Sequence, residues 1–101
     1  MIDFHKLQIG KKLYADGYYE ESMKCIEKLM EKYKYYTVYD SFFIDLIFSY
    51  NTICTFFNKT HEFTKAKKII DNIDNIDISD AQKDHCKEQY VKLCLGLKNT
   101  N

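Results

Sequence analysis

Apolar positions along the chain recur mainly at spacings of three and four residues, which is the period of an α-helix rather than of a β-strand. Residues 18–33 carry one apolar face, made of Tyr19, Met23, Ile26, Leu29, Met30 and Tyr33. Residues 62–73 carry a second, made of Phe63, Ala66, Ile69, Ile70 and Ile73. Residues 80–97 carry a third, made of Cys86, Tyr90, Leu93, Cys94 and Leu97. The pattern therefore predicts an amphipathic helix over each of these segments.

A further segment, from a cap at Thr37 or Asp40 to about Asn58, is apolar nearly all round. Its large or apolar side chains are Phe42, Phe43, Leu46, Ile47, Tyr50, Ile53, Cys54 and Phe57. A membrane span is one reading of such a segment, but Asp45 lies near its middle among several polar residues, and a charge at that depth is costly. We expect a central helix buried between others, and no membrane partner.

Local signals predict where the helices begin and end. Asp3 is a candidate cap for a first helix that runs to about Ala15, and Asp16-Gly17 is a break suited to a left-handed C-cap. Ser79 with Gln82 three residues later has the pattern of a capping box. We read residues 34–39 as a connection, and residues 71–80 as a polar linker whose isoleucines turn inward.

Glycine and proline are scarce, which bears on the fold class. The chain of 101 residues has no Pro and only three Gly, whereas small sheet-rich domains need many tight turns. The expected architecture is all-α: a single domain over residues 1–101 with about five antiparallel helices.

An internal repeat is visible in these helices. Tyr50-x2-Ile53-Cys54-x2-Phe57 has the same spacing as Tyr90-x2-Leu93-Cys94-x2-Leu97. Ser22 follows Gly10 by twelve positions, and Ala66 follows Cys54 by the same offset. Small residues at both ends of that offset predict notches where two successive helices approach closely.

This pattern resembles the tetratricopeptide repeat, with its W-x2-L-G-x2-Y and A-x3-F signature. One copy falls on Gly10, Leu13, Gly17, Ser22 and Ile26, and another on Tyr50, Ile53, Cys54, Phe57, Ala66 and Ile70. The spacings of 44 and 40 residues between Gly10, Cys54 and Cys94 exceed the family period of about 34, and Lys6 stands in the first Trp position.

The resemblance implies stacked helical hairpins: one at about residues 3–34, one at about residues 40–73, and a capping C-terminal helix at about residues 79–97. It also implies that the first helix of each hairpin lines an inner, ligand-facing surface. On this resemblance, the expected partner-binding residues are Leu7, Lys11, Tyr14, Asn51, Thr55 and Asn58.

Charge and candidate chemistry exclude several function classes. The chain has 15 acidic and 15 basic residues and no net charge, and every basic residue is Lys, which disfavours nucleic-acid binding. His5, His61 and His85 have no zinc-finger spacing with the four cysteines, and no phosphate loop or nucleophile motif is present. We expect a cytoplasmic protein with reduced thiols, no metal or other cofactor, and no enzymatic activity.

Nine tyrosines are the more informative feature, because Tyr combines contact area with a polar tip. Tyr33, Tyr35, Tyr36 and Tyr39 cluster in or beside a connection, where they either pack over a hairpin end or form an interaction patch. The expected function is a non-enzymatic protein–protein interaction module, an adaptor that binds a peptide or partner protein. Two alternatives stay open: a virus- or mobile-element-encoded inhibitor that occludes a host enzyme, and a homodimeric structural subunit that associates through Phe43 and Phe48 of the apolar helix.

Overall fold

The computed structural model describes residues 2–57 and 63–99, with side chains as far as residue 95, and in these residues it contains helices and no strands. The helices are α1 (Ile2–Ala15), α2 (Tyr19–Lys32), α3 (Ser41–Phe57), α4 (Phe63–Asp71) and α5 (Asp80–Asn99), with a short 3₁₀ turn η1 at Ile73–Asn75. The predicted all-α class is confirmed, and the predicted helix bounds agree to within a few residues. Residues 58–62, between the third and fourth helices, lie outside the described residues.

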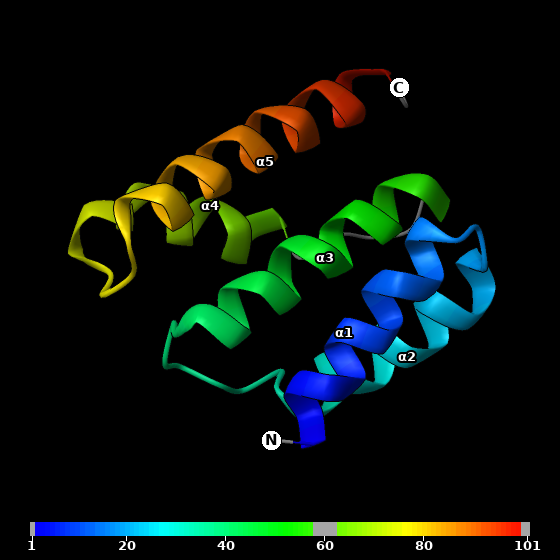
Figure 1. Cartoon of the computed structure of the whole chain (residues 1–101). Helices are drawn as coiled ribbons and strands as arrows, with labels where there is room; N and C mark the ends of the chain where they lie inside the picture. Colours follow the sequence, from blue (N-terminus) through cyan, green and yellow to red (C-terminus); the bar gives the residue numbers. More distant parts are fainter. Residues whose placement is uncertain (1, 58–62, 100–101) are drawn as a thin grey trace.

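The helix α3 is the centre of the fold. It packs against α1, α2, α4 and α5, and Figure 1 shows it between the hairpin of α1 and α2 on one side and the pair α4 and α5 on the other. Phe43, Leu46 and Ile47 are completely buried within it, and Phe48 is only 3% exposed. A helix that packs against four others needs apolar residues around most of its circumference, which explains its sequence.

Three of the predicted helix ends are confirmed by hydrogen bonds. An Asp40 carboxylate oxygen accepts from the Phe43 N–H at 2.9 Å, as an N-cap does. Ser79 and Gln82 bond reciprocally, side chain to backbone N–H, at 3.1 and 3.2 Å. Gly17 has a φ of +90° and closes α1, so the chain turns back into α2 at the predicted break.

Asp3 has a different role from the predicted cap. The helix α1 begins at Ile2, and the buried Asp3 carboxylate accepts hydrogen bonds from Lys32 Nζ at 2.7 Å and from the Tyr33 hydroxyl at 2.5 Å. The hydrogen bond from Lys32, and after it the weaker effect of the bond from Tyr33, hold the pKa of Asp3 below its usual value. The bond to Asp3 and the burial of the phenol raise the pKa of Tyr33 to about 12. Asp3 thus ties the start of α1 to the end of α2.

The first predicted notch is present between α1 and α2. The buried Ser22 hydroxyl donates to the Gly10 carbonyl oxygen at 2.6 Å. A Cβ atom added at Gly10 would lie 2.7 Å from Cγ1 of Ile26, which is itself fully buried. The glycine is therefore required for the two helices to lie this close. At the second predicted notch, Cys54 and Ala66 are both completely buried.

The linker before α5 also follows the prediction. Ile73 is buried, and Ile76 and Ile78 are half-buried against the core, while the aspartates of the segment are exposed. None of the four cysteines, all of which lie in the described residues, forms a disulfide bond. Among the described residues, no helix has both the length and the apolar character needed to cross a membrane.

Candidate partner-binding groove

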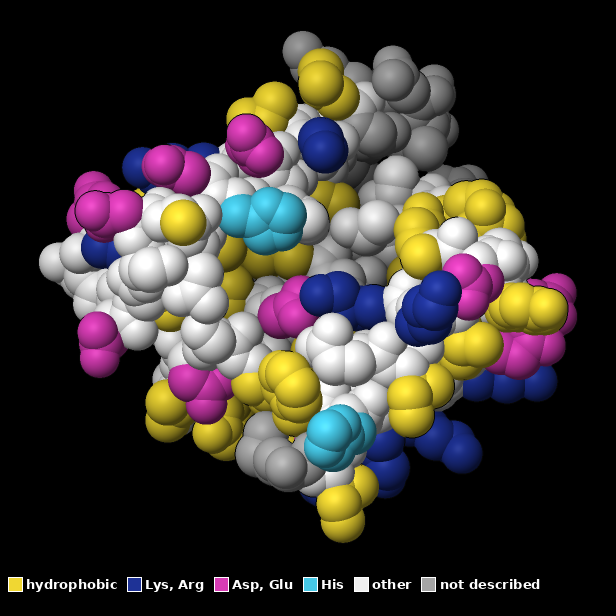
Figure 2. Space-filling model, in the orientation of Figure 1, with side chains coloured by type: hydrophobic (Ala, Val, Ile, Leu, Met, Phe, Trp, Pro, Cys, Tyr) yellow, Lys and Arg dark blue, Asp and Glu magenta, His cyan; other side chains and the backbone are white. Residues whose placement is uncertain are grey.

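A groove runs between α1 and α5, with α3 along its base. Its main cavity has a volume of about 400 Å³, and a second cavity of about 190 Å³ adjoins it. Both cavities are lined by Lys11, Asp45, His85 and Gln89, so they form two lobes of one groove. Figure 2 shows the hollow, with hydrophobic side chains in its walls and one pair of opposite charges near its centre.

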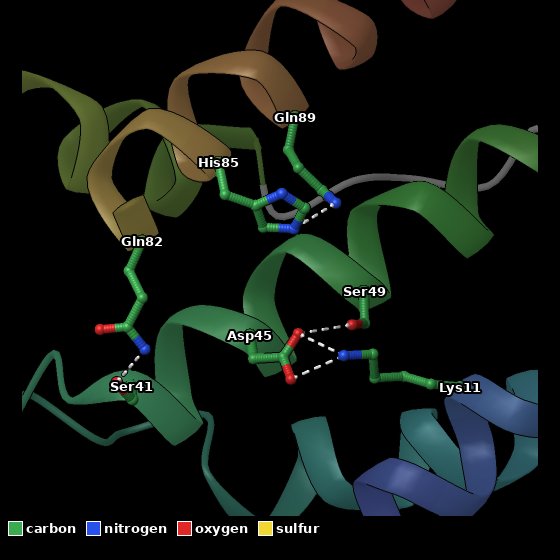
Figure 3. A network of polar contacts seen from close by, with 7 residues as sticks. All are labelled: Lys11, Ser41, Asp45, Ser49, Gln82, His85 and Gln89. Carbon is green, nitrogen blue, oxygen red and sulfur yellow. Dashed lines mark hydrogen bonds and ion pairs between the residues drawn. The ribbon is translucent and has the colours of Figure 1, made fainter. Parts of the chain in front are cut away.

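An ion pair joins α1 to α3 at the junction of the two lobes. Lys11 Nζ contacts both carboxylate oxygens of Asp45, at 3.1 and 2.9 Å, and the Ser49 hydroxyl donates to one of them at 3.3 Å. Figure 3 shows Lys11 reaching from α1 across to Asp45 on α3. The two charged side chains are 41% and 36% exposed, so the pair is open to solvent and to a ligand.

Helix α5 supplies the polar side chains of the opposite wall. Gln82 donates from Nε2 to the Ser41 hydroxyl oxygen at 3.0 Å and so ties α5 to the start of α3. Gln89 Nε2 lies 3.1 Å from His85 Nε2 one turn away, and both side chains face the groove in Figure 3. Donors and acceptors are therefore available on both walls.

The main lobe has an apolar lining contributed by three helices and the linker. Its apolar members are Phe4, Phe42, Ile44, Phe48, Ile78, Ala81 and Cys86. Burial raises the pKa of the Cys86 thiol, so this sulfur behaves as a small apolar group. Pockets of several hundred Å³ between helices, mostly apolar with a few polar groups, are typical of binding sites.

The structure brings only some of the predicted inner-face residues to this groove. Lys11 and Tyr14 line it. Leu7 and Asn51 are completely buried in the core, so neither side chain reaches a surface open to a partner. The Thr55 hydroxyl donates to the Asn51 carbonyl oxygen of its own helix at 3.0 Å. Asn58 lies outside the described residues.

The tyrosine cluster divides into two parts. Tyr36 and Tyr39 pack on Phe43, with ring centroids at 5.2 and 5.6 Å, and Tyr33 packs on Phe42 at 5.2 Å. Tyr35 is 85% exposed. Most of the cluster therefore covers the start of α3, and Tyr35 alone projects fully into solvent.

Residues that the prediction missed form two polar stripes. On α3 the groove is lined by Ser41, Asp45, Ser49 and Thr52. On α5 it is lined by Gln82, His85 and Gln89. Both sets recur at spacings of three and four residues, which place them on one helical face. That spacing was a usable signal within an otherwise apolar helix.

Among the side chains that the structure describes, no three of His, Cys, Asp and Glu gather where they would hold a metal ion. Comparison of the chain with protein-family models, curated proteins and solved structures finds no match. The likeness to tetratricopeptide repeats therefore remains an interpretation of the residue spacing.

Proposed function

We propose that the chain is a non-enzymatic interaction module that binds a peptide segment of a partner protein in the groove between α1 and α5. The observation that carries this proposal is the groove itself: about 400 Å³, walled by α1, α3 and α5, with apolar sides and polar groups at the junction of its lobes. These are the properties that let a site bury an apolar side chain and orient the polar groups beside it.

The first, third and fifth helices all face this groove. The tetratricopeptide-like interpretation implies part of this arrangement, because it gives α1 and α3, the first helices of the two hairpins, one shared surface, and it has α5 only as a capping helix. The tetratricopeptide-like interpretation and the groove-binding proposal rest on different observations. One concerns the spacing of small residues in the sequence, and the other concerns the cavity.

A dimer formed through α3 is less well supported. Phe43 and Phe48, the residues that would make that contact, are 0% and 3% exposed because the other helices of the same chain cover them. An inhibitor that occludes an enzyme would act through its exposed surface. Variants confined to the groove should therefore leave inhibition unchanged but weaken peptide binding, which distinguishes the two functions.

A displayed library of random peptides tests the proposal. Ala81 is exposed at the edge of the main lobe, so Ala81→Trp places a large ring in the groove without opening the core. Lys68→Trp is the matched control on the exposed surface of α4. Circular dichroism would first show that both variants keep the helical content of the parent chain.

We expect selected peptides to bind the parent chain and Lys68→Trp equally and to lose at least about tenfold in affinity for Ala81→Trp, which is about 1.4 kcal/mol. Peptides that bind all three proteins alike would use another surface and would contradict the proposal. A selection that enriches no peptide would contradict it as well.

A further inference from the structure

The junction of the two lobes has a charge balance that restricts what the groove can bind. Lys11 and Asp45 lie side by side there and neutralise each other. His85 and Gln89 complete the junction from the α5 side. A ligand that lies along the groove must pass this point, because both lobes share these four residues.

Each charged partner can make only one kind of hydrogen bond. The Lys11 ammonium only donates, and the Asp45 carboxylate only accepts. A ligand carboxylate would satisfy Lys11 but would lie against the negative charge of Asp45. A ligand ammonium would satisfy Asp45 but would lie against Lys11. An extended peptide residue presents its carbonyl oxygen for Lys11 and its N–H for Asp45 on the same side, and it brings no charge that either group would repel.

We propose that the groove selects an uncharged peptide segment, in which the C=O and N–H of one residue bridge Lys11 and Asp45 and the adjoining bulky apolar side chain fills the main lobe. This inference rests on the proposed function and adds the chemistry of the ligand to it. Backbone amides are the natural source of the bridging group, because each non-proline residue of a peptide carries both the donor and the acceptor.

The ion pair is suited to being opened by a ligand. Its two side chains are 41% and 36% exposed, and pairs this open contribute little to stability. Asp45 keeps the hydrogen bond from Ser49 when Lys11 moves, so the carboxylate is not left without a donor. The long lysine side chain turns without moving the backbone of α1.

The main lobe has room for the adjoining side chain. A dry apolar cavity of about 150 Å³ is large enough to bind benzene, and this lobe has about 400 Å³. Phe42, Phe48 and Ile78 give it a largely apolar wall next to Asp45. A phenylalanine side chain therefore fits together with its neighbouring amide.

Three derivatives of one amino acid test the charge selection, because they share the apolar side chain. N-acetyl-phenylalanine N-methylamide is neutral, N-acetyl-phenylalanine is an anion at pH 7, and phenylalanine N-methylamide carries an ammonium group. Each is titrated into the ¹⁵N-labelled chain, and the amide shifts of Ser49 and Gln89 report binding.

We expect the neutral derivative to bind about threefold to fivefold more tightly than either charged one. Equal or tighter binding of a charged derivative would overturn the inference and leave the proposed function standing. If none of the three moves the groove amides, the inference is overturned as well, and the peptide selection with Ala81→Trp decides the proposed function separately.

Variants of the ion pair should change the order of the three probes. Asp45→Asn leaves Lys11 uncompensated and should make the anion the tightest ligand, whereas Lys11→Met should make the ammonium derivative the tightest. The charge swap Lys11→Asp with Asp45→Lys should restore the preference for the neutral probe. Lys67→Met is the matched control, because it removes one charge from an exposed pair with Asp71 on α4. An order that is the same in all variants would contradict the inference, since a purely structural pair would not reverse it.

Discussion

The helix α1 packs closely against α2 on one side and is separated from α5 by an open groove on the other. Toward α2, α1 presents Gly10, and the helices close until the Ser22 hydroxyl bonds to the glycine carbonyl at 2.6 Å. Toward α5, α1 presents Lys11, and a cavity of about 400 Å³ remains. Adjacent residues of one helix thus face a closed interface, which the absence of a side chain at Gly10 permits, and an open groove.

Enlarging one residue on each side of this comparison should give the largest difference. Gly10→Leu forces a side chain against the buried Ile26, so we expect the free energy of unfolding to fall by about 3 kcal/mol. The melting temperature should fall by more than about 10 °C. Urea and thermal denaturation followed by circular dichroism measure both.

The control is Ala81→Leu, which adds a similar volume beside the open groove. We expect a change within about 0.5 kcal/mol. Similar losses for the two variants would show that the groove is as tightly packed as the hairpin, which would remove the basis of the comparison.

Removing one hydroxyl from the α1–α2 contact and one from the lining of the groove should give a smaller difference. Ser22→Ala deletes a buried hydrogen bond, and we expect a loss of about 1 to 2 kcal/mol from the free energy of unfolding. Ser41→Ala deletes the exposed bond from Gln82, and the change should stay within about 0.5 kcal/mol. Chemical denaturation of the two variants side by side gives the measurement, and a larger loss for Ser41→Ala would reverse the interpretation.

The Asp3–Tyr33 contact should give the closed interface a pH dependence, the smallest of these effects. The pKa of folded Asp3 lies below 3.8, so its stabilisation is complete above pH 3.8 and is lost as the pH falls through the lower folded value. The pKa of Tyr33 is raised from 10.0 to about 12, so its stabilisation is complete below pH 10 and is lost as the pH rises through 12.

Tyr33→Phe should therefore flatten the fall in melting temperature at alkaline pH. It should reduce the fall at acid pH only in part, because the hydrogen bond from Lys32 to Asp3 remains. Burial also raises the pKa values of Tyr14 and Tyr90, so part of the alkaline fall should remain. Tyr35→Phe is the control, because that side chain is 85% exposed, and it should give the profile of the parent chain. Identical profiles for the two variants would exclude the Asp3–Tyr33 bond as the cause.

The helix ends were predictable from the sequence because their signals are local. Asp40, Gly17 and the Ser79–Gln82 pair act on backbone groups within a few residues, so their effect does not depend on the rest of the fold. Asp3 was misread for the opposite reason. Its partners Lys32 and Tyr33 lie in a distant part of the sequence, and a carboxylate near a helix start looks the same whether it caps or reaches across.

The groove was predictable only in part, because α3 is apolar nearly all round and its sequence does not fix which face points toward α1. Asn51 was expected on the inner face, but its amide donates to the Ile47 carbonyl oxygen of the same helix at 2.9 Å. That bond to the preceding turn lets a polar side chain lie in the core. The groove is lined by Asp45, Ser49 and Thr52 instead, on a neighbouring face of α3.

The central position of α3 has a consequence for how the molecule opens. Since α3 packs against α1, α2, α4 and α5, no pair of helices on either side of it can detach without exposing one of its faces. Its amide protons should exchange with deuterated water more slowly than any others, at a rate set by global unfolding, whereas those at the outer turns of α5 should exchange through smaller local openings. The helix that packs against all four of the other α-helices is therefore the one whose protection reports on the whole chain.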